Sequence, residues 1–448
     1  MLLSDTGNQA AEYSSQSRRL HLRALQHMPL GVADNYRFWG MGDTVFIQNA
    51  RGAEITDLDG KKYVDFRLAY GPIILGYRDE RVDNAVIDCI RNIGSVTGFS
   101  SVLDSEVVEG IKALCPNIQK LRFANSGTEA VMGAVRCARG FTSRQKIVVV
   151  EGGFHGLYDE MMWKADIIGW DRTRQAAPTI KPFGRGLAVD SREQIELISL
   201  NDVAAVQAIF ASKGEQIAAV IIESIMGNCG SIAATAEYME CLRKTCDANG
   251  SLLIADEVKT GFRVAKGGVQ ELFGFRADLT TYAKALANGY PVAAFGGRAE
   301  VMDTIGHGND GVVHGGTYTA NLIGLTAAKA TLSILRDTGA LRTIAATGRR
   351  IMSVLSETFA RFGLPHAFTG HSSMFGIHFM EEAPANYRDW KRSNGQLYEK
   401  FAKQLIARGV MVEPDSREPW FICEAHRNVD LDWLGAMAQE SLRTALHG

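Results

Sequence analysis

Short, continuously apolar runs alternate with longer amphipathic stretches through the middle of the chain. The strand-like runs lie at 146–150, 218–222 and 251–255. The helix-like stretches lie at 104–115, 128–141, 235–249 and from just after 319 to about 335. Apolar strands that do not alternate, separated by helices, indicate a mostly parallel sheet covered on both faces. The pattern therefore predicts an α/β fold for the central part of the chain.

The two ends of the chain follow other patterns. After a short basic helix expected at 18–26, alternating segments lie at 44–47, 54–57 and 62–65, with Asp59-Gly60 between the last two. Alternation with a tight turn predicts a small antiparallel meander. The last hundred residues predict a separate α+β segment. Its strands are expected at 373–378 and 410–412.

Composition narrows the class of protein. With 448 residues the chain exceeds one compact core, so two or three domains are expected. A net charge of −2 indicates no general affinity for nucleic acid or anionic membranes. The apolar runs are far shorter than the ~20 residues that span a bilayer, and residues 1–16 are polar, unlike a signal peptide. We therefore expect a cytoplasmic protein.

The cysteines and histidines do not predict a metal centre. The seven cysteines are scattered and odd in number, which does not indicate a disulfide framework. The histidines show no zinc-binding spacing. We expect no metal cofactor.

One lysine carries the strongest chemical signal. Lys284 lies in a small-residue turn at 280–289, and Asp256 ends the apolar run before it. An amine that forms a Schiff base and an acid that keeps a pyridine nitrogen protonated are what pyridoxal phosphate requires. Taken alone, such a lysine is more often solvated, and such an aspartate more often caps a helix or forms an ion pair.

Two further segments fit the same cofactor. Ser126, Gly127 and Thr128 stand where a short strand passes into a helix, whose N-terminus suits a phosphate. Phe154 follows the strand at 146–150, where it would stack on a flat ring. Taken singly, these residues are more often a helix cap and a core side chain. Their order along the chain, ending in Lys284, is much more specific.

Five segments resemble one family as a set. They are 70–76 (YGPIILG), 125–130 (NSGTEA), 254–263 (IADEVKTGFR), 267–271 (GGVQE) and 314–321 (HGGTYTAN). With these motifs the chain resembles the class III PLP-dependent aminotransferases of fold type I, over roughly residues 30–440. Within them it is most similar to the branch that contains glutamate-1-semialdehyde 2,1-aminomutase.

The resemblance implies a fold and an assembly. A large PLP-binding domain is expected at 76–330, and a smaller α+β domain is expected from an N-terminal part at 1–75 and a C-terminal part at 331–448. The family also implies a homodimer with its site at the subunit interface. Small-molecule amines and keto or aldehyde compounds are the expected substrates.

The resemblance also implies roles for single residues. Lys284 would form the Schiff base with the cofactor, and Asp256 would pair with its pyridine nitrogen. The remaining cofactor residues would be Ser126, Gly127 and Thr128 at the phosphate, Phe154 and Val258 on the two ring faces, His155 and Glu223 near the cofactor, and Thr317 at the partner subunit's phosphate. For the substrate, Arg37 would bind a carboxylate, Tyr70 would line the pocket, and Glu418 would match an active-site acid of the aminomutases.

The departures from the aminomutase pattern favour one activity. Ala285-Leu286-Ala287-Asn288-Gly289 replaces a glycine-rich run after the lysine, and Glu223-Ser224 replaces Glu-Pro. The segment 164–187 shows no similarity to the aminomutase gating loop. We therefore predict amino transfer between a donor and a carbonyl acceptor. A 2,1-aminomutase and an amino-sugar or aminoglycoside aminotransferase are the alternative enzymes, and a non-catalytic PLP-binding regulator is the alternative of another class.

Overall fold

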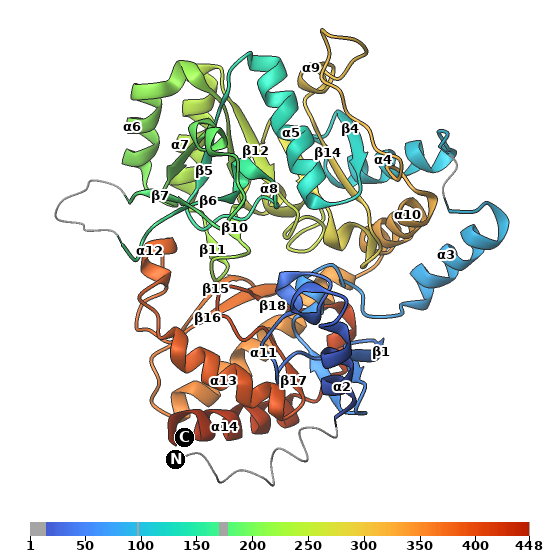
Figure 1. The fold of residues 1–448 in the computed structure, drawn as a ribbon, viewed down its shortest axis with the longest axis vertical. Helices are drawn as coiled ribbons and strands as arrows, with labels where there is room; N and C mark the ends of the chain where they lie inside the picture. Colours follow the sequence, from blue (N-terminus) through green and yellow to red (C-terminus); the bar gives the residue numbers. More distant parts are fainter. Residues whose placement is uncertain (1–14, 96–97, 170–177, 448) are drawn as a thin grey trace.

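The computed structural model describes residues 15–95, 98–169 and 178–447. Its centre is a seven-stranded sheet (Figure 1). Across the sheet the strands are β4 (Lys120–Ala124), β14 (Ala293–Gly297), β13 (Leu279–Tyr282), β12 (Leu252–Asp256), β9 (Ile217–Ile222), β5 (Lys146–Val150) and β8 (Ile195–Ile198). β14 runs antiparallel to both of its neighbours, and the other adjacent pairs are parallel. The predicted mostly parallel sheet is confirmed.

Helices cover both faces of this sheet. Ile147 and Val149 of β5 pack with α5 (Gly127–Thr142), whereas Val148 and Val150 pack with α6 (Val203–Lys213) and α7 (Ala236–Asn249). Because successive strand residues point to opposite faces, a strand buried on both sides must be apolar throughout. This is why the central strands were recognisable as continuous apolar runs.

Further helices complete the large part of the molecule. They are α3 (Glu80–Asn92), α4 (Val102–Leu114), α8 (Gly268–Phe273), α9 (Ala299–Met302) and α10 (Leu322–Asp337). Within the described residues no helix is both long and apolar enough to cross a bilayer.

The two ends of the chain meet in the smaller part (Figure 1). Val410 of the C-terminal segment pairs in parallel with Val64 of the N-terminal meander. The strands of this sheet are β1 (Ile47–Arg51), β2 (Glu54–Asp57), β3 (Lys62–Asp65) and β17 (Val410–Met411). A second sheet contains β15 (Ala367–His371), β16 (Met374–His378) and β18 (Trp420–Phe421). The helices are α2 (Gln16–Ala24), α11 (Ala340–Arg361), α12 (Tyr387–Trp390), α13 (Gly395–Ala407) and α14 (Leu431–His447).

The start of the meander differs from its prediction. The strand expected at 44–47 is wrong, since β1 begins at Ile47, where pairing with Asp57 starts. The Thr44 hydroxyl instead donates to the carbonyl of Gly40 at 2.8 Å, which holds the preceding residues in a turn. The domain boundaries near residues 75 and 330 stay predictions.

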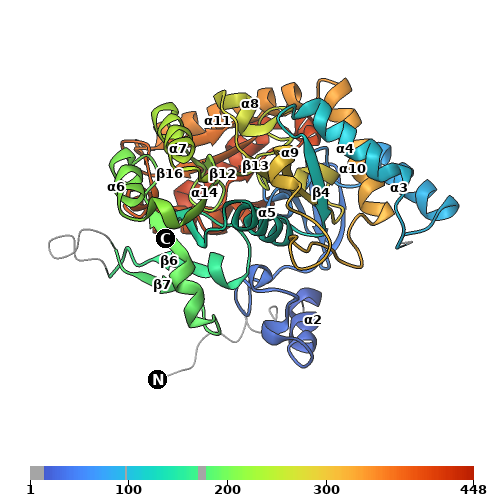
Figure 2. The same cartoon turned by 90° about the horizontal axis from the view of Figure 1, so that it is seen from above.

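Two short antiparallel pairs stand outside the three larger sheets. One is the hairpin of β6 (Trp163–Ala165) and β7 (Ile180–Pro182), which lies on the same side of the molecule as α2 (Figure 2). The other joins β10 (Ile225–Met226) to β11 (Ile232–Ala233), just beyond β9.

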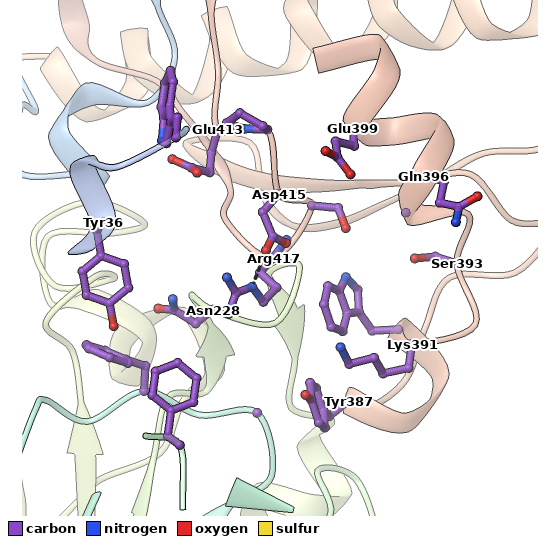
Figure 3. Close-up of a pocket in the computed structure, with 18 of the residues that line it drawn as sticks. Tyr36, Asn228, Tyr387, Lys391, Ser393, Gln396, Glu399, Glu413, Asp415 and Arg417 are labelled. Atoms are coloured by element: carbon purple, nitrogen blue, oxygen red, sulfur yellow. Dashed lines mark hydrogen bonds and ion pairs between the residues drawn. The ribbon is translucent and has the colours of Figure 1, made fainter. Parts of the chain in front are cut away.

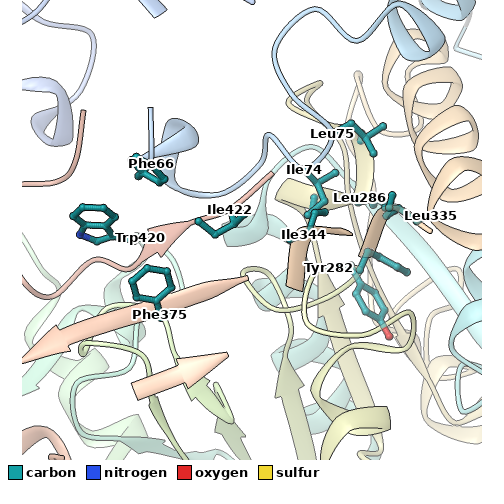
Figure 4. Packing of buried hydrophobic residues seen from close by; sticks show 14 of the residues in the cluster. Phe66, Ile74, Leu75, Tyr282, Leu286, Leu335, Ile344, Phe375, Trp420 and Ile422 are labelled. Carbon is teal, nitrogen blue, oxygen red and sulfur yellow. The ribbon is translucent and has the colours of Figure 1, made fainter. Parts of the chain in front are cut away.

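One hydrophobic cluster runs from the smaller part to the edge of the central sheet (Figure 4). In the smaller part, Trp420 packs against Phe66 and Phe375 with ring centroids 4.9 and 6.1 Å away. At its other end the same cluster includes Leu286 and Tyr282, which flank Lys284. The turn that carries Lys284 is therefore anchored in the core on both sides.

A pair of glycines tests how tightly α5 packs on the sheet. A Cβ at Gly133 of α5 would lie 2.4 Å from the buried ring of Phe295, so Gly133→Ala should lower the free energy of unfolding by about 1–3 kcal/mol. At Gly110 of α4 the nearest atom would be 3.5 Å away, and the better helix propensity of alanine should leave Gly110→Ala neutral or up to ~1 kcal/mol more stable. Chemical denaturation of both variants measures the difference, and equal effects would contradict the packing described here.

Candidate active site

Polar side chains gather where the parallel strands end. β12 ends in Asp256, β9 is followed by Glu223, and the turn after β13 carries Lys284. Asp256 is the register partner of Thr281 on the neighbouring parallel strand, three residues before Lys284. Because β9, β12 and β13 run in the same direction, their carboxyl ends share one edge, which is where ligands bind in such sheets.

Asp256 is a buried carboxylate with several partners. Its Oδ2 atom lies 2.7 Å from Nδ1 of His155, and Oδ1 accepts hydrogen bonds from the Thr281 hydroxyl and the Val258 amide, each at 3.0 Å. The other ring nitrogen of His155, Nε2, is buried and has no hydrogen-bond partner in the described part of the chain. The carboxylate is therefore held in one orientation, as a partner for a protonated pyridine nitrogen must be.

Lys284 stands in a strained turn. Its φ of 46° is in the left-handed region, which non-glycine residues rarely adopt, and it begins a short 3₁₀ segment at Lys284–Ala287. Its Nζ atom makes no hydrogen bond to another described residue. Burial, reinforced by the Lys259 ammonium, lowers the pKa of Lys284 to about 8. A depressed lysine pKa leaves more neutral amine for bonding to a carbonyl carbon.

Residues 126–128, at the start of α5, form a cup in which backbone amides are available as hydrogen-bond donors. The Ser126 hydroxyl caps the helix by accepting from the Glu129 amide at 3.2 Å. The amides of Gly127 and Thr128 have no acceptor among the described residues. The loop after β5 packs on this cup, since the Leu157 amide donates to the Thr128 hydroxyl at 3.3 Å. Free amides at a helix N-terminus fit a phosphate group.

The two expected ring faces lie beside the cup. A Cβ at Gly127 would come within 3.0 Å of Val258 Cγ1, so the start of α5 approaches Val258 closely. The Phe154 amide donates to Glu223 Oε1 at 2.9 Å, which holds the loop after β5. A phosphate cup, two apolar faces, a fixed carboxylate and an unbonded amine at one edge together fit pyridoxal phosphate.

Glu223 is buried behind this loop. Besides the Phe154 amide, it accepts from the Gly227 amide at 3.0 Å. Burial raises the pKa of Glu223, and the nearby Asp256 carboxylate raises it further. Glu223 thus fixes two backbone segments that border the site.

A cavity of about 1140 Å³ opens next to the cofactor residues (Figure 3). Its walls come from the N-terminal segment, the large part and the C-terminal segment. Representative lining residues are Tyr36, Phe154, Lys164, Asn228, Trp390 and Arg417. Aromatic rings and charges of both signs share the wall, which suits a substrate with both polar and apolar groups.

The substrate candidates lie in different places. Arg37 is 65% exposed, pairs with Asp34 at 2.8 Å, and does not line the cavity, whereas its neighbour Tyr36 does. The Tyr70 hydroxyl donates to the Tyr36 carbonyl at 2.6 Å, so Tyr70 supports the cavity wall from behind. Glu418 is mostly buried and pairs with Lys259 at 2.7 Å. Thr317, the expected contact to the partner subunit's phosphate, is exposed.

Sequence reasoning missed several residues of this site. Lys259 stands in a motif that was recognised, yet no role was assigned to it. Asn228, Arg417 and Lys164 line the cavity without any local signal that marks them. Lys164 is held by the Gly153 carbonyl at 2.5 Å, and burial lowers its pKa to about 8.

Known proteins match the chain along most of its length. A family model described as Aminotransferase class-III matches residues 40–426. The glutamate-1-semialdehyde 2,1-aminomutase of Desulforapulum autotrophicum is 35% identical over 422 residues, which cover 94% of this chain and 96% of that protein. An omega-transaminase from Sphaerobacter thermophilus superposes with a TM-score of 0.90 at 27% identity, over 98% of this chain and 100% of that one.

A solved transaminase with PLP bound also shares the fold. It has a TM-score of 0.83 and 25% identity and covers 99% of each chain. The matched family range includes all the candidate cofactor residues and excludes Arg37. The predicted fold type, enzyme class and cofactor, pyridoxal 5'-phosphate, are confirmed. The chain belongs to the class III family of PLP-dependent aminotransferases.

Proposed function

We propose that this protein transfers an amino group from a donor amine to a separate carbonyl acceptor, with Lys284 as the cofactor-bearing residue. The observation that carries the proposal is the pairing of two neighbouring parallel strands. Asp256 and Thr281 are register partners there, so the fixed carboxylate and the turn of Lys284 leave the same edge.

The cofactor supplies an electron sink when it is bound. The chain would hold the cofactor in position: Asp256 would pair with the protonated pyridine nitrogen, and the amides of Gly127 and Thr128 would bind the phosphate. Phe154 and Val258 would contact the two faces of its ring. His155 orients Asp256 from behind by the 2.7 Å contact.

Lys284 is the proposed proton carrier. When Nζ is not bonded to the cofactor, it would act as the general base that takes the proton from the substrate carbon bearing the amino group, and it would then act as the acid that gives this proton back. With a pKa of about 8, an appreciable fraction of this amine is neutral near pH 7–8 and accepts a proton without first losing one.

The cavity favours transfer between two molecules. Its volume of about 1140 Å³ exceeds the usual range for small-ligand pockets, and its charges of both signs suit alternating donor and acceptor. The second candidate is a 2,1-aminomutase, which the 35% identity to such an enzyme favours. In that case donor and acceptor carbons belong to one molecule.

We also propose a homodimer. Thr317 is flanked by Val313 and Tyr318, whose exposed fractions are 71% and 65%. Further exposed apolar residues are Ile90 of α3 and Ile93 just after it, and the Leu322 amide donates to the carbonyl of Ser95 at 2.9 Å, which ties the segment after α3 to the start of α10. Exposed large apolar side chains of this kind suit a subunit interface. The expected cytoplasmic location remains a prediction from the sequence.

The acceptor requirement tests the proposed reaction. Purified PLP-form enzyme mixed with a donor amine should form about one carbonyl product per site and then stop until a carbonyl acceptor is added. Steady turnover without any acceptor, starting from the pyridoxamine form, would identify the aminomutase instead. Product counting by mass spectrometry distinguishes the two.

Lys284→Ala should reduce turnover by more than about a thousand-fold, because the proton carrier and the covalent anchor are both lost. Borohydride reduction of the wild-type enzyme should attach the cofactor to the peptide containing Lys284. The matched control is Lys244→Ala, at a lysine that is 73% exposed and pairs with Glu240, and it should label normally. Labelling of another lysine in wild-type enzyme would refute the proposed role.

Arg37 and Arg417 are the two candidates for binding the carboxylate group of a substrate. Arg37→Ala should raise KM for carboxylate substrates roughly 10- to 100-fold, the size of a lost charged hydrogen bond, and leave carboxylate-free amines unchanged. Arg417 lines the cavity and pairs with Asp415 at 2.7 Å. If only Arg417→Ala raises KM for carboxylate substrates selectively, then Arg417 in the C-terminal segment binds the carboxylate. The proposed role of Arg37 would then be wrong.

The dimer has its own test. Sedimentation velocity should give twice the 48.8 kDa mass of the chain. Replacing the exposed Val313 by Asp should shift the enzyme toward monomers, since a buried unpaired charge is costly. A wild-type enzyme that sediments as a monomer at micromolar concentration would contradict the proposal.

A further inference from the structure

A second lysine is buried at the edge that carries Lys284. Lys259 is 5% exposed, and its Nζ contacts three acceptors: the Gly227 carbonyl at 2.7 Å, Asn228 Oδ1 at 2.8 Å and Glu418 Oε2 at 2.7 Å. An ammonium group has three N–H donors and no acceptor, so three acceptors satisfy it fully. Neutral lysine would have only two donors for them. Lys259 and Glu418 therefore form a buried ion pair.

Glu418 completes an ion pair from the other end of the chain. Its side chain is 12% exposed, and Oε1 accepts from the Asn228 amide at 2.5 Å while Oε2 accepts from Lys259. The Asn228 side chain thus contacts both members of the pair, and Asn228 lines the cavity. One side of the pair is linked to the substrate space.

The strand register brings the two lysines together. Lys259 lies three residues beyond Asp256, and Lys284 lies three residues beyond Thr281. Asp256 and Thr281 are partners on adjacent parallel strands. The turns that carry the two lysines therefore follow neighbouring parallel strands at the same edge of the sheet.

Close packing fixes the position of Lys259. A Cβ at Gly227 would lie 2.1 Å from Lys259 Cδ and 2.9 Å from Glu223 Oε2. The Gly227 peptide thus fills the space between Lys259 and Glu223. It donates to Glu223 at 3.0 Å and accepts from Lys259.

We propose that Lys259 and Glu418 are positioning residues of the amino-transfer site, which set the proton affinity of the Lys284 nitrogen through opposite charges and hold Asn228 at the cavity wall. The proposal rests on the proposed cofactor-bearing role of Lys284. After burial, the Lys259 charge is the next cause that lowers the pKa of Lys284, and Glu418, Glu223 and Asp256 oppose it. Other titratable groups near this edge are His155, which contacts Asp256, Lys164, which interacts with Glu223, and Tyr36 and Arg417, which lie near Glu418.

A purely structural role is the competing explanation. The pair also ties the turn after β12 to the C-terminal segment, 159 residues away. Loss of such a tie would disturb the site in the same way whichever partner is removed. An electrostatic role requires the two removals to act with opposite sign.

The experiment is a pH titration of the visible absorbance of the holoenzyme without substrate, which follows the proton on the nitrogen joining Lys284 to the cofactor. Lys259→Met should raise the midpoint by about one pH unit, the effect of one charge within roughly 10 Å at an effective dielectric constant of about 20. Glu418→Gln should lower it by a similar amount. The double variant should return to within a few tenths of a unit of the wild type.

The double variant guards against misfolding, because it leaves no unpaired buried charge. If Lys259→Met does not fold, comparing the double variant with Glu418→Gln isolates the removal of the Lys259 charge, which should still raise the midpoint. Shifts of the same sign in both single variants, or no shift, would overturn the proposal. A wild-type holoenzyme without any visible absorbance band of Lys284-bound cofactor would instead refute the role of Lys284, and a visible band in the wild type that does not shift in either variant would overturn the present proposal alone.

Discussion

The parallel pairing of β12 with β9 and β13 is the interaction on which the site depends. Ile254 pairs with Ile221 on one side and with Leu279 on the other, so three strands end at one edge. A different group stands at the end of each strand or directly after it: the Asp256 carboxylate, the Glu223 carboxyl group and the Lys284 amine. Reversing any one strand would move its group to the opposite end of the sheet.

Burial explains how these groups behave. Taking charged groups out of water raises the pKa of carboxyl groups and lowers that of amines, as it does for Glu223 and Lys284. The site limits this cost by giving the acids partners. Asp256 has an imidazole, a hydroxyl and an amide, and Glu223 has two backbone amides. Lys284 has no hydrogen-bond partner among the described residues, and it is the residue proposed to react.

A buried arginine, Arg263, joins the parts of the chain between which the cavity lies. Arg263 donates to the carbonyl of Ile422 at 2.9 Å and of Ser373 at 3.2 Å, and it also bonds to the carbonyl of Gly71. Burial lowers the pKa of Arg263 to about 10. One guanidinium therefore joins the segment after β12 to both ends of the chain. Because the cavity lies between these parts, its shape follows from contacts that are remote from the cofactor.

The sequence by itself determined the helices and strands and the order in which the candidate cofactor residues follow one another along the chain. Periodicity is a local property, so the strand at 146–150 and the helices near α5 and α7 could be predicted almost to the residue. Polar residues at the ends of apolar strands, Asp256 above all, were visible for the same reason. The resemblance to a known family added the cofactor.

Only the tertiary structure decided which distant groups meet. The pairing of His155 with Asp256 spans 101 residues, and that of Lys259 with Glu418 spans 159. The exposure of Arg37 and its pairing with Asp34 likewise follow from packing rather than from its motif. The parallel pairing of Val410 with Val64 is of the same kind. Local patterns report which face of an element is buried, but contacts between segments depend on how the whole chain closes, and no local pattern encodes them.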